Sequence, residues 1–225
     1  MAEAVEPPAV RHHEIRPPDP SELVAIVDSS NAYDDRLAAL WALAIHTGSR
    51  QSELLGLAWA DVDLQGVTLT IRRTLARVEA CVPQFGDPKS AAGRRTVSLP
   101  AEAIASLRSH RARQNEERLA AGTNWVDFDL VFATQLDTPL MRGNLFRDFN
   151  ASLERAGLPR TIRFHDLRHA HATLMLRAGV PLKVASGRLG HGSIAMTADL
   201  YQHVAQDMDA DAADRAQRAL RGALA

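Results

Sequence analysis

Four segments of this sequence read as α-helices, and each is followed at once by a glycine. Glycine is common just past the last turn of a helix because it adopts a left-handed backbone conformation at little steric cost. The glycines are Gly48, Gly122, Gly157 and Gly179, and the helices that they end are predicted over 37–47, 100–121, 142–156 and 165–178. A chain divided in this way must bury much of its apolar surface between helices.

The remaining elements are shorter. Asp19, Pro20, Ser21 and Glu22 together look like the start of a helix, and further helices are predicted over 49–58, 181–189, 193–203 and 207–222. Residues 67–77 alternate and are rich in β-branched side chains, which indicates a strand. Residues 97–99 are expected to close a second or third strand after a turn at 89–93. The predicted fold class is therefore α+β, mostly helical with a small antiparallel β-sheet.

Length and composition limit the possibilities further. At 225 residues the chain can hold one full core, or one domain and a short arm, and the proline-rich residues 1–20 read as that linker or arm. The sequence has no apolar run long enough to span a membrane and no signal-like N-terminus, so no membrane partner is predicted. Cys81 is the single cysteine, which excludes an intrachain disulfide and fits a reducing, cytoplasmic location.

The charge distribution is less uniform than the total suggests. The formal net charge of −1 argues against a typical nucleic-acid-binding protein, which is usually basic. Between Arg72 and Arg95, however, six basic residues stand against two acidic ones, and this stripe can either follow phosphates or simply be a solvated face. Lys89 and Lys183 are the two lysines among 26 basic residues. Unlike arginine, a lysine can lose its proton at an accessible pH.

Residues 165–201 contain a group of side chains suited to phosphodiester chemistry. A helix that starts near His165 places His165 and Arg168 on one face, because residues i and i+3 are neighbours there. The imidazole of His165 titrates near neutral pH, and the guanidinium of Arg168 is a permanent cation. His191 and Tyr201 follow, and add a hydrogen-bond donor and a phenol. A base, a fixed cation, a donor and a phenol together fit attack on a phosphodiester.

Other interpretations of the same residues remain open. The segment HDLRH at 165–169 resembles the zinc motif H-E-x-x-H, with Asp166 in place of the glutamate, so a zinc-dependent hydrolase is one alternative. Aspartate is one methylene shorter than the general base of that motif, and Arg168 would bring a fixed cation near the metal. Each residue taken alone also has a simpler interpretation, such as a surface ion pair between Arg50 and Glu53 or a packing role for Tyr201.

Taken in order, several short motifs resemble the tyrosine recombinases, the phage integrase family. The motifs are TGSRQSELL at 47–55, PKS at 88–90, RRTVSLP at 94–100, HDLRH at 165–169, LGHGS at 189–193 and YQH at 201–203. The resemblance covers roughly residues 20–205. It implies a nucleophile at Tyr201, which attacks a DNA phosphodiester and leaves a 3′-phosphotyrosyl link and a free 5′-hydroxyl.

The resemblance also assigns roles to the other motif residues. Arg50 and Arg168 are expected to clamp the non-bridging phosphate oxygens, and His191 is expected to donate a hydrogen bond to the phosphate. His165 occupies the position of a general acid or base. Lys89, expected in a β-hairpin turn, is the candidate acid for the leaving 5′-oxygen.

Glu53 matches an acid of the family that supports the catalytic residues and does not itself contact the substrate. No metal and no nucleotide cofactor are implied. His169, His171 and His203 are expected to pack or to support the site, and Arg188 and Lys183 are expected at the surface.

The chain departs from the family in its domain organisation. Residues 1–20 are predicted to be a linker or arm and 21–225 the catalytic domain, whereas the helical core-binding domain that usually precedes it is expected to be absent. Half of a DNA clamp contacts fewer phosphates, so a catalytically weak DNA-binding or regulatory remnant is a further alternative. The expected partner is double-stranded DNA. Four protomers should assemble on DNA and exchange the helix at 207–225, whereas the free chain should be mainly a monomer.

Overall fold

The computed structural model describes residues 17–193, 217–218 and 220–221 of the chain. Between residues 17 and 193 the helices are α1 (Pro20–Ala32), α2 (Ala38–Thr47), α3 (Gln51–Leu55), α4 (Ala101–Ala121), α5 (Arg142–Arg155), α6 (Phe164–Arg177) and α7 (Leu182–Leu189). The strands are β1 (Val62–Asp63), β2 (Thr68–Ile71), β3 (Thr74–Glu79), β4 (Val82–Gly86) and β5 (Arg95–Ser98), and the short 3-10 helices are Trp59–Asp61, Ala91–Gly93 and Gly122–Asn124. The helices predicted over 193–203 and 207–222 fall outside the described residues, apart from a few isolated positions.

The strands form two separate antiparallel sheets. One has the order β1-β2-β5, with Leu69 of β2 opposite Val97 of β5, and the other is the hairpin β3-β4. The strand predicted over 67–77 therefore breaks at Arg72 and Arg73, because β2 and β3 pair with different partners. The side chain of Arg73 anchors the backbone between β2 and β3, because its Nε donates to the carbonyl of Gly56 at 2.8 Å.

The hairpin turn lies at Ala80 and Cys81, which both have positive φ, as a two-residue turn of a twisted hairpin requires. Lys89 is not in this turn, contrary to the prediction. It lies in the loop between β4 and the 3-10 helix Ala91–Gly93, which leads from one sheet into the other.

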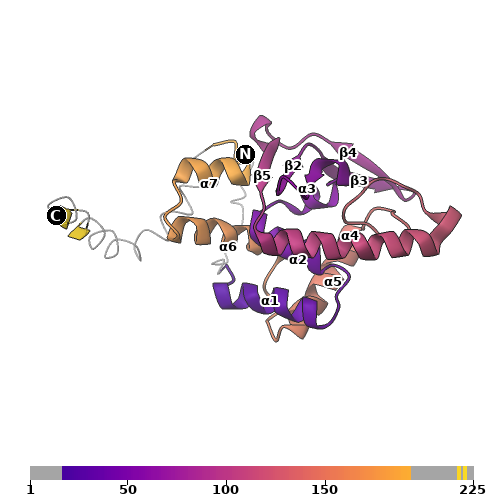
Figure 1. The fold of residues 1–225 in the computed structure, drawn as a ribbon, viewed down its shortest axis with the longest axis horizontal. Coiled ribbons are helices and arrows are strands. Elements are labelled where there is room, and N and C mark those ends of the chain that lie inside the picture. Colours follow the sequence, from indigo (N-terminus) through magenta and orange to yellow (C-terminus); the bar gives the residue numbers. More distant parts are fainter. Residues whose placement is uncertain (1–16, 194–216, 219, 222–225) are drawn as a thin grey trace, which may run out of the picture.

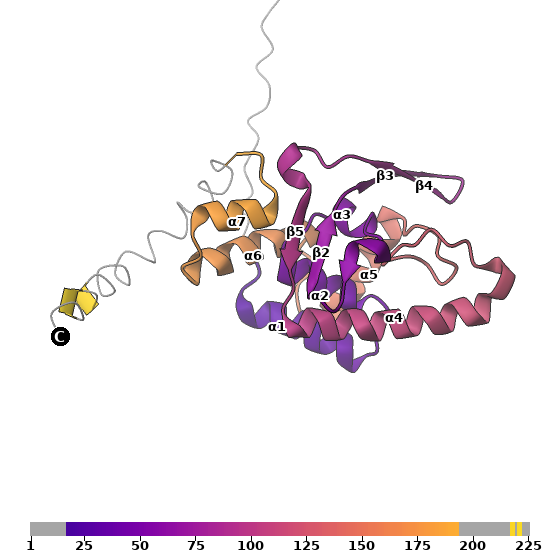
Figure 2. The same cartoon turned by 45° about the horizontal axis from the view of Figure 1, so that its top comes forward.

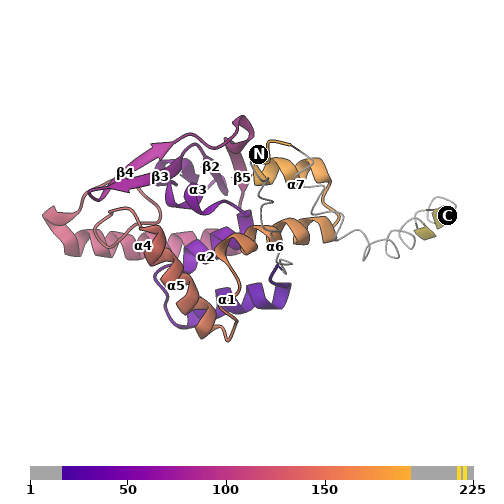
Figure 3. The same ribbon diagram turned by 180° about the vertical axis from the view of Figure 1, so that it is seen from behind.

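Helix α2 runs through the middle of the core. Almost all of its side chains are buried, and it packs against α1, α4 and α6. In Figures 1 and 3, α1 and α5 lie on one side of the layer formed by α2, α4 and α6, and the strands with α3 lie on the other. Figure 2 shows the β3-β4 hairpin extending away from β2 and β5. This arrangement confirms the predicted α+β class.

A cluster of aromatic rings fixes α2 against its neighbours. Trp41 is fully buried, and its ring centroid lies 5.2 Å from that of Phe149 on α5 and 6.0 Å from that of Phe164 on α6. A second, smaller apolar cluster joins α6 to α7 through Ala172, Met175, Leu176, Ala185 and Leu189. Helix α7 is thereby packed against α6.

Replacing Trp41 with alanine tests this arrangement. Truncation of a large buried aromatic side chain removes its contacts and leaves a cavity, so the free energy of unfolding should fall by about 3–5 kcal/mol. Urea unfolding followed by circular dichroism measures the change. Val24→Ala, on the exposed face of α1, is the control and should change the stability by less than about 0.5 kcal/mol. Similar losses in the two variants would mean that Trp41 does not organise the core.

Candidate active site

The turn between α2 and α3 is built on Gly48. Its φ is +60°, and a Cβ added here would lie 2.7 Å from Cδ2 of Leu189 and 2.8 Å from Cδ2 of His171. Glycine is thus required both by the left-handed backbone and by the close approach of α6 and α7. The turn places Arg50 as the residue that precedes the first turn of α3.

Arg50 and Glu53 pair across the first turn of α3. The backbone N–H of Arg50 donates to Oε2 of Glu53 at 2.9 Å, and Nη1 of Arg50 donates to Oε1 at 2.8 Å. Glu53 is 1% exposed, whereas the Arg50 side chain is 26% exposed. The pair is therefore not the surface ion pair of the simpler interpretation: the carboxylate is buried, and the guanidinium keeps a side open to solvent.

A second arginine, Arg95 at the start of β5, binds the same carboxylate. Its Nη2 lies 2.9 Å from Oε2 of Glu53, and its Nη1 donates to Oε1 at 3.2 Å. Burial by itself would raise the pKa of Glu53, but the hydrogen bonds and charge of Arg95 and the hydrogen bonds of Arg50 outweigh it and lower the pKa below its ordinary value. Arg95 was not among the predicted site residues. Arg95 lies in the RRTVSLP motif at 94–100, but the sequence could not show which of Arg94 and Arg95 turns inward.

Arg168 extends from α6 into the gap between two helix ends. Its Nη1 donates to the carbonyl of Gly48 at 2.6 Å, and its Nη2 donates to the carbonyl of Leu189 at 2.7 Å. These carbonyls lie at the C-terminal ends of α2 and α7, where the helix dipole favours a cation. Burial and the neighbouring Arg50 lower the pKa of Arg168 to about 9, so the guanidinium stays charged at pH 7.

Three imidazoles border this group of arginines. His165 and His169, one turn apart on α6, meet edge to face with ring centroids 4.9 Å apart. His165 is open to solvent on one side. Burial of its other side lowers the pKa of His165, and the charges of His169 and Arg168 lower it further. The pKa of His169 is lowered by burial and by the charge of Arg168, in spite of the opposite effect of Asp166.

His191 follows the end of α7, where Gly190 adopts a left-handed conformation with φ +66°. The backbone N–H of His191 donates to the carbonyl of Ser186 at 3.1 Å, which fixes the turn. Burial, then the charges of Arg168 and Arg50, lower the pKa of His191 to about 4. The imidazole is therefore neutral at pH 7 and offers a hydrogen-bond donor without adding a charge.

The loop that carries Lys89 lies beside this turn. A Cβ on Gly190 would be 2.9 Å from the carbonyl oxygen of Ala92, and a Cβ on Gly192 would be 3.5 Å from Cβ of Ser90. Lys89 is exposed in this loop. Tyr201 and His203 lie outside the described residues, as does most of the predicted tail helix at 207–225. The structure thus brings together Arg50, Glu53, His165, Arg168 and His191, with the Lys89 loop next to them.

Arg188 was expected at the surface, and this prediction is wrong. It is half-buried on α7, its Nε donates to Nε2 of His171 at 3.3 Å, and its Nη2 donates to the carbonyls of His46 and Ser98. Burial and Arg188 lower the pKa of His171 to about 3. Lys183 is exposed, as expected.

Two observations bear on the zinc-hydrolase and membrane alternatives. Among residues 17–193 and the few described beyond them, no three His, Cys, Asp or Glu side chains are grouped so that they could hold a metal ion. In the same part of the chain, no helix combines the length and the apolar character needed to cross a membrane.

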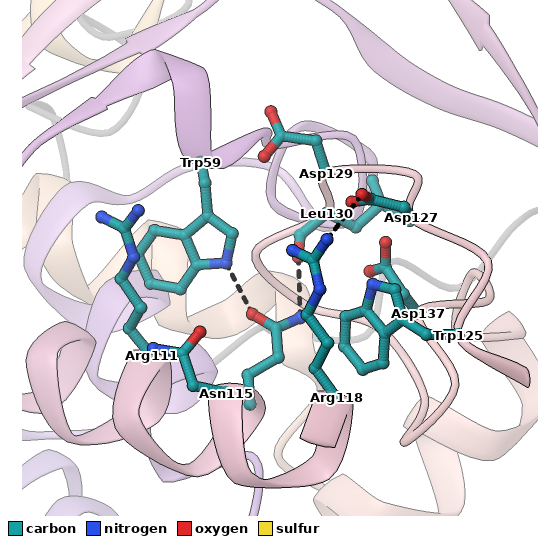
Figure 4. A pocket seen from close by; sticks show the side chains of 10 residues that line it. Trp59, Arg111, Asn115, Arg118, Trp125, Asp127, Asp129, Leu130 and Asp137 are labelled. Carbon is teal, nitrogen blue, oxygen red and sulfur yellow. Dashed lines mark hydrogen bonds and ion pairs between the residues drawn. The ribbon is translucent and has the colours of Figure 1, made fainter. Parts of the chain in front are cut away.

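A small cavity of about 90 Å³ lies elsewhere, between α4 and the loop at 125–137 (Figure 4). Its wall is a hydrogen-bonded chain in which Nε1 of Trp59 donates to Oε1 of Gln114 at 2.5 Å, and Nε2 of Gln114 donates to the carbonyl of Leu130 at 2.9 Å. None of the predicted site residues lines it. This cavity is therefore separate from the candidate site.

Comparison with known proteins decides the family. The model of the phage integrase family matches residues 15–208. The chain belongs to this family. It is 40% identical over 181 residues to a protein named "Tyrosine recombinase XerC-like" from Caldanaerobacter subterraneus subsp. tengcongensis, a match that covers 75% of this chain and 46% of that relative. The resemblance drawn from the motifs is therefore confirmed.

Solved structures show the same fold. The XerA recombinase aligns with a TM-score of 0.69 and 23% identity over 92% of this chain and 66% of that one. The Tn1549 transposon integrase, solved in complex with circular intermediate DNA, aligns with a TM-score of 0.67 and 23% identity over 84% of this chain and 63% of that one. The integrase-family chain described here spans roughly half the length of the curated relatives that it matches.

The substitution Glu53→Gln tests the buried charge pair. It leaves Arg95 buried without its counter-charge, so the free energy of unfolding at pH 7 should fall by about 3–5 kcal/mol. Because the folded-state pKa of Glu53 lies below the ordinary 4.5, the unfolded chain binds the proton more readily. The stabilisation is therefore complete above about pH 4.5 and is lost as the pH falls through the folded-state pKa.

Urea unfolding between pH 7 and pH 3 checks this expectation: the gap in unfolding free energy between wild type and variant should stay constant down to about pH 4.5 and narrow below it. Glu154→Gln is the matched control, because Glu154 pairs with Arg160 in an ion pair whose two side chains are more than half exposed. That control should lose less than about 1 kcal/mol. A gap between wild type and Glu53→Gln that stays constant with pH would contradict the role of the ionised carboxylate.

Proposed function

We propose that this chain is the catalytic domain of a site-specific DNA recombinase that cuts and rejoins strands through a 3′-phosphotyrosyl intermediate. In this function Tyr201 is the nucleophile, and Arg50 and Arg168 hold the scissile phosphate. His165 acts as general acid or base, His191 donates a hydrogen bond and Lys89 protonates the leaving oxygen. Glu53 supports Arg50. The motif order and the family assignment support these roles.

An excess of positive charge at the site supports this function most directly. Arg50 and Arg95 share the buried carboxylate of Glu53, and Arg168, whose described hydrogen bonds go to two carbonyls, adds a third positive charge close to them. Burial and, after it, the charges of Arg168, Arg50 and Arg95 lower the pKa of His191. A site with three clustered cations around one shared carboxylate favours an anion such as a phosphodiester.

Phosphoryl transfer concentrates negative charge on the non-bridging oxygens in the transition state. Planar guanidinium groups match these oxygens in a bidentate manner. Arg168 is already fixed by the carbonyls of Gly48 and Leu189, and Arg50 by Glu53, so the donors need little reorganisation. A preorganised donor of this kind is worth about 3–4 kcal/mol in the transition state.

Proton transfers complete the reaction. The phenol of a tyrosine is mostly protonated at pH 7, because its reference pKa is about 10. His165, whose lowered pKa keeps it neutral at pH 7, can accept this proton as Tyr201 attacks phosphorus. The bond from phosphorus to the 5′-oxygen breaks, and Lys89 donates a proton to that oxygen. Attack by a new 5′-hydroxyl reverses these steps, so rejoining needs no ATP.

The proposed substrate is double-stranded DNA, as in the Tn1549 integrase complex. We place residues 1–20 as a linker and 21–225 as the catalytic domain. Four protomers would act together on DNA through the tail at 207–225, and the free chain would be mainly monomeric in the cytoplasm. The net charge of −1 fits weak binding by this domain alone.

Covalent capture tests the nucleophile. The wild-type chain should form a slow, detergent-resistant adduct with nicked suicide duplexes, recovered from a library with randomised sequence around the nick. Tyr201→Phe should abolish the adduct while it leaves the circular dichroism spectrum unchanged, because the substitution removes one oxygen.

Electrophoresis under denaturing conditions measures the adduct. An adduct that persists in Tyr201→Phe would exclude Tyr201 as the nucleophile. Sequence-specific DNA binding without any wild-type adduct would instead favour the regulatory remnant.

The role of Lys89 is tested by Lys89→Arg, which keeps the charge but removes a proton that can be donated. Cleavage should slow by roughly 10²–10⁴-fold, the usual effect of losing a general acid. A substrate with sulfur at the 5′-bridging position needs no acid and should restore most of the rate. Lys183→Arg, which changes the other lysine of the chain, is the control and should cleave both substrates like wild type. Equal defects of Lys89→Arg on both substrates would mean that Lys89 only binds DNA.

A further inference from the structure

We propose that Arg95 is a positioning residue that fixes the loop of Lys89 against the arginine and histidine side of the site. This inference rests on the proposed recombinase function. It assigns to Arg95 no contact with DNA, because four of its five N–H groups are bonded inside the protein, whereas the described hydrogen bonds of the equally buried Arg168 use two.

Arg95 donates hydrogen bonds to three separate segments. Its Nη1 and Nη2 reach the carboxylate of Glu53 at 3.2 and 2.9 Å. Its Nη1 also donates to the carbonyl of Gly93 at 3.0 Å, and its Nε donates to the carbonyl of Arg188 at 2.7 Å. Four of the five N–H groups of a guanidinium can be accounted for in this way.

Each of these segments carries a group of the proposed reaction. Glu53 holds Arg50. Gly93 ends the loop that begins at Lys89, and Arg188 lies in the last turn of α7, three residues before His191. Arg95 itself is held by the sheet, where it stands opposite Ile71 of β2. One rigidly placed guanidinium therefore sets the distances between these three parts of the site.

The turn after α7 is shaped around this side chain. A Cβ on Gly190 would lie 2.7 Å from Nη1 of Arg95, closer than real contacts allow. Gly190 therefore leaves the space in which the guanidinium passes between α7 and the Lys89 loop. Lysine could not replace arginine here, because its donors diverge from one nitrogen and cannot span a carboxylate and two carbonyls.

Without these contacts, the Lys89 loop would lose its anchor to the turn that carries His191. The general acid would then be misplaced relative to the phosphate held by Arg50 and Arg168. A misplacement of about 1 Å costs roughly 10²-fold in rate. Loss of the Arg95 contacts should therefore slow protonation of the leaving oxygen more than it weakens DNA binding.

The experiment compares Arg95→Lys with wild type on the captured suicide duplex, in its ordinary form and with sulfur at the 5′-bridging position. We expect Arg95→Lys to cleave the ordinary duplex about 10²-fold more slowly at saturating DNA, with a dissociation constant within about threefold of wild type. On the duplex with sulfur at the 5′-bridging position, the rate of Arg95→Lys relative to wild type should be at least about tenfold higher than on the ordinary duplex. Rates are normalised to the folded fraction measured by urea unfolding.

Arg36→Lys is the matched control. Arg36 forms the same kind of contact at the opposite end of α2, with Nε and Nη2 on the Glu117 carboxylate at 2.6 and 2.7 Å and Nη1 on the carbonyl of Ala133 at 2.5 Å. It should lose stability as Arg95→Lys does, yet cleave both substrates at the wild-type rate per folded molecule. Should Arg95→Lys fail to fold, Gly190→Ala serves as the second variant, because its methyl group crowds both the Arg95 guanidinium at 2.7 Å and the Ala92 carbonyl of the Lys89 loop at 2.9 Å and removes no charge.

Several results would overturn the inference. Equal losses on the two substrates would show that Arg95 does not act through the Lys89 loop. Weaker DNA binding with an unchanged rate at saturation would make Arg95 a DNA contact. A wild-type rate per folded molecule would leave it a purely structural residue. If the wild-type chain forms no adduct, the proposed function itself fails. If it does form an adduct and one of the three results above is obtained, only the role of Arg95 is excluded.

Discussion

The ion pairs of the buried Glu53 carboxylate with Arg50 and Arg95 join parts of the chain that are distant in sequence. A carboxylate that is 1% exposed is stable as an anion only if it is paired and hydrogen-bonded. Here it accepts from the backbone and side chain of Arg50 and from both Nη atoms of Arg95. These bonds fix α3 against β5, and the other donors of Arg95 extend the connection to α7.

The ends of helices supply the second part of the framework. Carbonyls at the C-termini of α2 and α7 hold Arg168, and left-handed glycines at positions 48 and 190 let both helices end there. The site therefore collects three guanidinium groups around a single carboxylate. This local excess explains how a chain with a net charge of −1 can present a site for an anion. Burial and the charges of Arg168 and Arg50 lower the pKa of His191 to about 4, so its imidazole is neutral at pH 7.

Predictions from sequence were most accurate where short-range rules apply. Gly48, Gly122 and Gly179 follow the ends of helices within a residue or two of the predicted positions, because helix ends depend on the local backbone. The strand predicted over 67–77 was divided, and Lys89 lay outside the hairpin turn, because pairing partners are chosen by contacts distant in sequence. Arg188 was misjudged for the same reason: its partners His46, Ser98 and His171 come from three different elements.

The sequence by itself determined the helical character of the chain, its family and the residue types of the candidate site, since spacing and motif order are local properties. Only the tertiary structure decided which of two adjacent arginines, Arg94 or Arg95, binds Glu53. Arg94 is exposed and pairs with Asp87, whereas Arg95 turns inward. Successive side chains of an extended backbone point to opposite sides, and the bonds of Arg95 to Glu53 of α3 and to the Arg188 carbonyl of α7 decide which of the two sides is buried.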